Sequence, residues 1–121
     1  MIDTKQILES AAVNGPQWSH ECEDLDITLL YWNEGDAIPE HVNHEVDVVV
    51  IGLSGVGVVT VAGESSLMGP GSLVVIPKGI KRAFTAGAGG FGQLNIHKRR
   101  KRLQVQLQVP AEQRKRRSSG K

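Results

Sequence analysis

The feature that most constrains this chain is a succession of short apolar stretches that alternate with polar residues and are bounded by glycine or proline. Stretches rich in Val, Ile, Leu and Thr with this alternation are typical of strands. They predict strands at 26–32, 46–53, 57–62, 72–76, 82–85 and 91–97. Ahead of them, Asp3 or Thr4 can cap a short helix that extends to Ala12 and is stopped by Asn14-Gly15-Pro16.

So many short strands in 121 residues indicate one all-β domain, closed as a sandwich or a barrel. Closure matters because open strand edges promote aggregation.

The longest apolar run, Val48–Ile51, is far too short to cross a bilayer, so we expect no membrane partner. The N-terminus lacks a signal-peptide pattern, and the single cysteine, Cys22, excludes an internal disulfide. We therefore expect a reducing, cytoplasmic setting.

The overall net charge of +1 conceals two regions of opposite sign. Residues 1–97 carry a net charge of −8, whereas residues 98–121 carry +9, mostly in clusters at 98–102 and 114–117. Between the clusters, 103–109 alternates in a strand pattern that can add to the sheet or pair with the edge of a neighbouring molecule. The chain thus divides into a helix and lead-in (1–24), a barrel (25–97) and a basic C-terminal extension (98–121). Such a tail is either solvated or an arm for nucleic acid or an acidic partner.

Two stretches within the predicted barrel carry a family resemblance. The first stretch contains Gly35, His41, Asn43, Asp47 and Gly55. The second contains Gly71, Pro77, Gly79 and Arg82. These stretches resemble the two motifs of the cupin superfamily. The spacing from Gly35 to His41 and from Gly71 through Pro77 to Gly79 matches those motifs. The resemblance spans about residues 25–97 and implies a double-stranded β-helix, or jelly roll, that is often dimeric.

The departures from the cupin pattern concern the metal ligands. Metal-binding cupins use three histidines and one glutamate, and His41 keeps the first histidine position. Asn43 replaces the second histidine, Asp47 falls at the glutamate position, and Arg82 replaces the last histidine. Asn is a poor ligand for a divalent transition ion, and Arg brings a fixed positive charge to the place of a cation. These replacements therefore give no support to a bound metal cofactor.

Arg82 inside such a barrel needs an anion. One hypothesis is that an Asp47–Arg82 ion pair fills the space that the ion occupies in other cupins. The alternative is that Arg82 holds the carboxylate or phosphate of a ligand in a bidentate contact. If the register is shifted, His41, His44, Glu45 and His97 form a different ligand set for a divalent transition metal.

The sequence thus predicts a cupin that binds a small, anionic molecule in a cleft lined by His41, Asn43, Asp47 and Arg82. The resemblance to cupins also implies a homodimer. The first alternative is a metal-dependent enzyme of the dioxygenase or isomerase type that uses His41 with non-standard ligands. The second alternative is an interaction protein that works through its basic tail. No complete catalytic constellation is visible, and whether the chain is an enzyme stays open.

Overall fold

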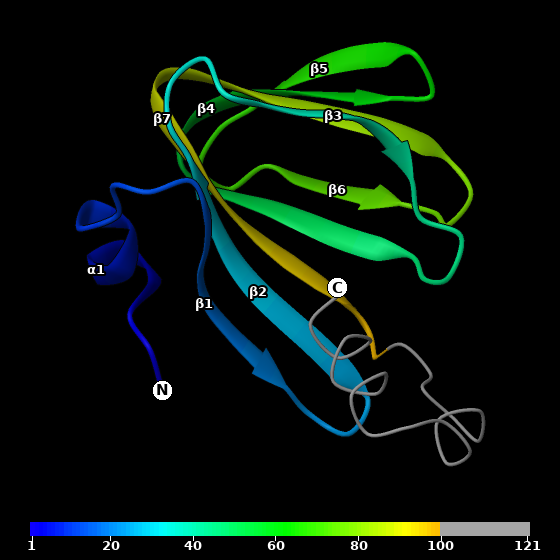
Figure 1. Cartoon of the computed structure of the whole chain (residues 1–121), viewed down its shortest axis with the longest axis horizontal. Helices are drawn as coiled ribbons and strands as arrows, with labels where there is room; N and C mark the ends of the chain where they lie inside the picture. Colours follow the sequence, from blue (N-terminus) through cyan, green and yellow to red (C-terminus); the bar gives the residue numbers. More distant parts are fainter. Residues whose placement is uncertain (100–121) are drawn as a thin grey trace, which may run out of the picture.

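The structure, a computed structural model, describes residues 1–99 and consists of one short helix followed by seven strands (Figure 1). The elements are α1 (Thr4–Glu9), β1 (Gly15–Glu21), β2 (Leu25–Trp32), β3 (Ala37–Val42), β4 (Val48–Val61), β5 (Glu64–Met68), β6 (Leu73–Ile76) and β7 (Lys81–Lys98). Within this part of the chain, no helix is long and apolar enough to span a bilayer. The predicted strand at 103–109 lies outside the described residues.

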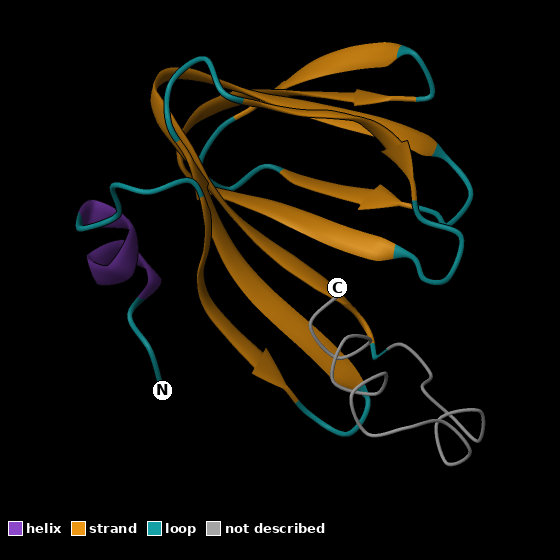
Figure 2. Ribbon diagram, viewed as in Figure 1, coloured by secondary structure: helices purple, strands orange, loops and turns teal. Residues whose placement is uncertain are grey.

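Two long strands, β4 and β7, bend and contribute to both layers of a sandwich (Figures 1 and 2). The first half of β7 pairs with β3 and with the second half of β4, which in turn pairs with β5. The second half of β7 pairs with β2 and with the first half of β4, and β1 and β6 extend this layer at its two edges. All of these pairings are antiparallel, and the predicted all-β jelly roll is confirmed.

Strand β4 bends at Gly55, between the two strands predicted at 46–53 and 57–62. Gly55 has a φ of +68°, and the register shifts on either side of it, between Gly52 and Ser54 and between Gly55 and Gly57. A side chain at Gly55 would collide with the carbonyl oxygen of Gly90 on β7. A β-bulge of this kind turns a strand from one layer into the next without ending it. The separate strands predicted at 46–53 and 57–62 are therefore one strand.

The helix is shorter than predicted and ends at Glu9 rather than Ala12. Its start is as expected, because the Asp3 carboxylate accepts hydrogen bonds from the amides of Lys5 (3.1 Å) and Gln6 (3.2 Å). At the other end, the Ser10 hydroxyl donates to the carbonyls of Ile7 and Gln6. This local bonding competes with continuation of the helix. The sheet accordingly begins with β1 at Gly15, before the predicted barrel boundary at residue 25.

Aliphatic side chains with two phenylalanines form the core between the layers. The buried members are Val46, Val48, Val50, Val59, Met68, Ile76, Phe84, Ala86 and Phe91. Burial of each large side chain contributes about 1.5–3 kcal/mol relative to leaving it in water. The core does not fill the whole space between the sheets, and the remaining volume forms the cavity described below.

Candidate ligand-binding cleft

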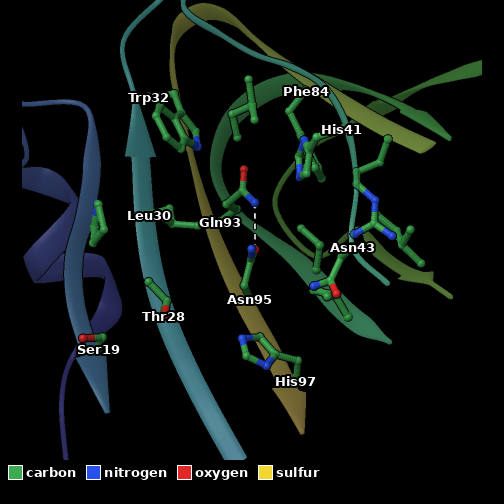
Figure 3. Close-up of a pocket in the computed structure, with 16 residues that line it drawn as sticks. Ser19, Thr28, Leu30, Trp32, His41, Asn43, Phe84, Gln93, Asn95 and His97 are labelled. Carbon is green, nitrogen blue, oxygen red and sulfur yellow. Dashed lines mark hydrogen bonds between the residues drawn. The ribbon is translucent and has the colours of Figure 1, made fainter. Parts of the chain in front are cut away.

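A cavity of about 610 Å³ lies between the two layers and has a mixed lining (Figure 3). Its polar lining residues are Ser19, Thr28, His41, Asn43, Arg82, Gln93, Asn95 and His97. Its apolar lining residues are Pro16, Leu30, Trp32, Ile38, Val48, Val50, Ile76 and Phe84. A concave site with an apolar wall and a few converging polar groups is the usual form of a small-molecule site.

The alternation of side chains along β2 and β7 directs the polar residues inward. Thr28 lies directly opposite Asn95, and Leu30 lies opposite Gln93, on the same face of the layer. On the other layer, His41 of β3 lies opposite Arg82 of β7. The cavity is therefore lined from both layers, and β7 contributes to each of them.

Arg82 is a charged residue of the cavity lining, and only 4% of it is exposed. Its Nε donates to the Ile80 carbonyl at 2.9 Å, and one terminal nitrogen donates to the Pro77 carbonyl at 3.1 Å. Burial lowers the pKa of the guanidinium, yet an arginine keeps its charge at neutral pH. Within residues 1–99, the one ion pair is between Arg99 and Glu21, so Arg82 is held by neutral carbonyls.

His41 and Asn43 come from the end of β3 and the loop that follows. The His41 ring lies with Nδ1 3.0 Å from the Pro39 carbonyl, so this nitrogen is the donor and Nε2 is the other ring atom available to a ligand. The Asn43 side-chain oxygen accepts from the amides of Glu45 (2.9 Å) and Val46 (3.2 Å). Its Nδ2 remains to donate to a ligand.

The structure places Asp47 outside the cleft, and the predicted Asp47–Arg82 ion pair is wrong. Asp47 is exposed between Val46 and Val48, which are both buried, so its side chain points outward. Its carboxylate instead accepts from the Lys78 amide at 2.9 Å. Asp47 thereby holds the turn before β7 whose carbonyls bind Arg82.

The alternative metal-ligand set is not brought together either. His41 and His97 line the cavity, whereas His44 and Glu45 are exposed and lie outside the lining. Over residues 1–99, no three His, Cys, Asp or Glu side chains are placed to hold a metal ion. The groups that do converge on the cavity include amides and a permanent cation, and this donor set does not fit a divalent transition ion.

Sequence reasoning missed the polar residues that β2 and β7 contribute, chiefly Gln93 and Asn95. Gln93 is fully buried, and its Nε2 donates to the Asn95 side-chain oxygen at 2.8 Å (Figure 3). The available signal was that both residues alternate with Leu94 and Ile96 within a predicted strand. A polar residue on the inner face of a barrel strand marks a polar interior.

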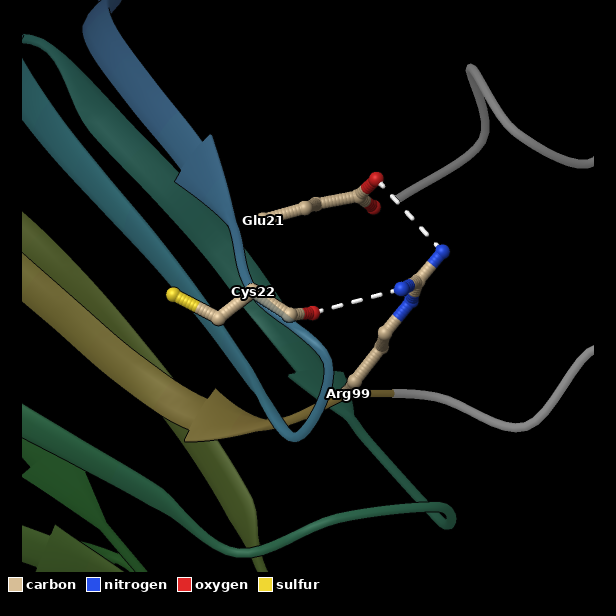
Figure 4. A network of polar contacts seen from close by, with 3 residues as sticks. All are labelled: Glu21, Cys22 and Arg99. Carbon is tan, nitrogen blue, oxygen red and sulfur yellow. Dashed lines mark hydrogen bonds and ion pairs between the residues drawn. The ribbon is translucent and has the colours of Figure 1, made fainter.

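The start of the basic tail contacts the acidic turn between β1 and β2 (Figure 4). Arg99 pairs with the Glu21 carboxylate at 4.0 Å and donates to the Cys22 carbonyl at 3.2 Å. The Arg99 amide also donates to the Asp24 carbonyl at 2.8 Å. Both side chains of the ion pair are partly exposed, so the pair contributes at most about 1 kcal/mol.

Solved structures of bacterial proteins share this fold. A protein from Neisseria meningitidis, NMB1881, aligns with a TM-score of 0.70 and 21% identity, over 82% of this chain and 99% of that one. A cupin-2 domain containing protein from Shewanella frigidimarina aligns with a TM-score of 0.67 and 18% identity, over 81% and 94% of the two chains. A conserved protein of unknown function from Streptococcus pyogenes is 28% identical, with a TM-score of 0.58, over 67% and 69%.

Comparison with curated proteins found no relative. The sequence of residues 29–89, half of the chain, matches the family described as Cupin domain. The matched region includes β3 to β6 and the first half of β7, which carry both motifs of the predicted resemblance. Family match, jelly-roll topology and structural neighbours agree, and the chain belongs to the cupin family.

Proposed function

We propose that this cupin binds a small anionic molecule in the cavity, with Arg82 as the anchor. The observation that carries the proposal is a buried guanidinium on the cavity wall whose protein partners are neutral carbonyls. Buried charges in proteins are normally paired, because an isolated ion loses its hydration without compensation. An anionic ligand supplies the missing charge and accepts hydrogen bonds from the free edge of the guanidinium.

The neighbours of Arg82 suit the same ligand. His41 lies directly across the β3–β7 ladder and lines the cavity, and it adds a second donor when its ring is protonated. The Asn43 Nδ2 adds a neutral donor from the adjacent loop. This set is suited to holding oxyanions. It gives less support to the alternative of a metal-dependent dioxygenase or isomerase, because no set of three ligand donors converges within residues 1–99.

Calorimetric titration and thermal shift with simple anions test the proposal. Acetate, butanoate, phosphate and sulfate are titrated into the wild-type protein at constant ionic strength, together with an uncharged analogue such as butanamide. We expect at least one anion to raise the melting temperature and to bind with a stoichiometry of one per chain. The Arg82→Met variant should lose this response.

A matched control is the neighbouring cation, Lys81. Lys81 is exposed and alternates with Arg82 along β7, so Lys81→Met removes a positive charge from the outer face only. This variant should bind the same anion as tightly as the wild type. Equal loss in both variants would show a general surface-charge effect, and no response of the wild type to any anion would overturn the proposal.

We propose in addition that the protein forms a homodimer through the outer face of the layer that contains β6. Partly or fully exposed apolar side chains form two rows across four strands: Ile27, Ile96, Val49 and Val75 in one row, and Leu94, Ile51 and Leu73 in the other. Leu73 and Val75 are 60% and 55% exposed on β6, at the edge of this layer. A contiguous apolar patch of this kind favours a second copy as its cover.

A further inference from the structure

The cavity contains two buried polar atoms that form no hydrogen bond within residues 1–99. They are the indole Nε1 of Trp32 and the side-chain Oε1 of Gln93. Gln93 is 0% exposed, and both residues line the cavity (Figure 3). A buried donor or acceptor without a partner costs about 1–3 kcal/mol. Native structures rarely retain such groups unless a ligand, ion or water completes them.

The two atoms belong to neighbouring positions on one face of one layer. Gln93 lies opposite Leu30, and Trp32 is two residues further along β2, so Trp32 and Gln93 are diagonal neighbours. Diagonal pairs on an antiparallel ladder are within reach of long and aromatic side chains. The hydrogen bond from Gln93 Nε2 to Asn95 fixes the amide with its oxygen turned away from Asn95. One small group can therefore meet both atoms.

These atoms lie apart from the anion anchor, in the other layer of the sandwich. Arg82 and His41 belong to the other layer, which is about 10 Å away in sheets packed face to face. Gln93 and Arg82 are both buried, with 0% and 4% of their surface exposed, whereas Trp32 is half-buried and His41 is exposed. The cavity thus has a charged end, defined by Arg82 and His41, and a neutral end, defined by Trp32 and Gln93.

We propose that the neutral end binds a neutral group that both accepts and donates a hydrogen bond, namely a hydroxyl or a primary carboxamide. The inference rests on the proposed anion binding, because the same ligand would place its carboxylate at Arg82. Trp32 offers only a donor, and Gln93 Oε1 offers only an acceptor. A second carboxylate at this end would face the Gln93 oxygen, and an ammonium would face the indole N–H. The ligand class is therefore a short carboxylate with a hydroxyl or carboxamide at its far end.

Matched carboxylates distinguish this subsite from simple anion binding. Butanoate, 4-hydroxybutanoate and succinamate form one series, and pentanoate, 5-hydroxypentanoate and glutaramate form a second series that is one carbon longer. Each is titrated calorimetrically into the full chain. In at least one series we expect the hydroxyl or carboxamide member to bind about tenfold more tightly than the unsubstituted acid.

Two variants locate the effect. Trp32→Phe removes the N–H and keeps an aromatic ring, and Gln93→Met removes the acceptor and keeps the length. Each variant should reduce the hydroxyl or carboxamide advantage, measured against the unsubstituted acid in the same variant, to about twofold or less. The control Thr85→Val lies on the exposed face of β7 and should leave the advantage unchanged. Melting temperatures verify that each variant folds.

The two proposals fail in different ways. If the unsubstituted acids bind through Arg82 but hydroxyl and carboxamide give no advantage in either series, the neutral subsite is overturned and the anion site stands. An advantage that persists in both Trp32→Phe and Gln93→Met also overturns it. If no carboxylate of either series binds the wild type, the proposed anion site fails for this class and the neutral subsite fails with it.

Discussion

His41 and Arg82 lie directly opposite each other on β3 and β7, and both line the cavity. The imidazole and the guanidinium therefore belong to one wall, which carries the positive charge of the site. The turn that precedes Arg82 is fixed independently, because Asp47 accepts from the Lys78 amide and the Asn43 carbonyl accepts from the Gly79 amide at 2.7 Å. The orientation of Arg82 is thus determined by the fold before any ligand binds.

Replacement of Arg82 should separate binding from stability. Arg82→Met removes two hydrogen bonds to carbonyls but also removes a buried charge, so these effects oppose each other. We expect the free energy of unfolding to change by less than about 2 kcal/mol, while the anion affinity falls at least about tenfold. Arg82→Lys should recover little of the affinity, because an ammonium lacks the planar fork that binds the two carbonyls on one side and an oxyanion in a bidentate contact on the other. Urea unfolding and calorimetry measure the two quantities.

The pH dependence follows from the same residue. Burial lowers the pKa of Arg82, so the unfolded chain holds this proton more tightly than the folded chain. The contribution of Arg82 to stability therefore rises with pH only where the guanidinium titrates, far above neutrality. Between about pH 7.5 and 9.5, the affinity for sulfate should stay within about twofold. A steep loss in that range would show that another group carries the charge.

Restoring imidazoles should create a metal site. The double variant Asn43→His/Arg82→His places two further imidazoles beside His41 and removes the permanent cation. We expect it to bind Zn²⁺ or Ni²⁺ at about one ion per chain, as measured by metal analysis after dialysis and by calorimetry. Arg82→Met is the control, since it removes the cation without adding a ligand. Equal metal binding by this control would place the ion elsewhere.

The bulge of β4 should not tolerate a side chain. At Gly55, with φ +68°, a Cβ would collide with the Gly90 carbonyl, whereas at Gly63, with φ +85°, a Cβ meets nothing within 4 Å. Both alanine variants place an L-residue in the left-handed region, but only Gly55→Ala adds the collision. We expect Gly55→Ala to cost at least about 3 kcal/mol and Gly63→Ala about 1 kcal/mol in urea unfolding. Similar costs would mean that the strands separate easily at the bend.

The proposed dimer depends on the apolar face of β6. Val75→Asp introduces a charge into this face, and we expect light scattering to report a shift from dimer to monomer at micromolar concentration. Val13→Asp is the control, because Val13 is 73% exposed in the segment before β1, away from β6. A wild-type protein that is monomeric under the same conditions would contradict the proposal.

The basic extension offers a separate test of partner binding. Truncation after Arg99 keeps the contact with Glu21 and removes most of the positive charge of the tail. If the tail is an interaction arm, the full chain should retard a DNA or RNA duplex in a salt-dependent manner, and the truncated chain should not. If the full chain does not retard the duplex at low salt, this result would favour an acidic protein partner, or the acidic residues of 1–97, as the contact of the tail.

The strands were predictable from simple alternation and the jelly roll from the cupin motifs, but the site was predictable only in part. His41, Asn43 and Arg82 line the cavity, as the motif positions imply. Asp47 does not, because the Asn43 side chain bonds the following amides and interrupts the extended backbone between them. The motif position of Asp47 therefore does not bring its side chain to the cavity wall.

Other features depend on contacts between distant segments. β1 was missed because its residues are largely polar and exposed at a sheet edge. The unpaired atoms of Trp32 and Gln93 are invisible in the sequence, since whether a polar group finds a partner depends on the packing of every element around it.

The continuity of β7 has a consequence for how binding selectivity could change. Arg82 and Gln93, the two ends of the proposed ligand site, are on the same strand and are separated by a glycine-rich bend. The distance between the charged end and the neutral end is therefore a property of backbone curvature rather than of the lining side chains. A substitution in the bend would change the length of the ligand that fits between the two ends, while the residues that contact the ligand stay the same.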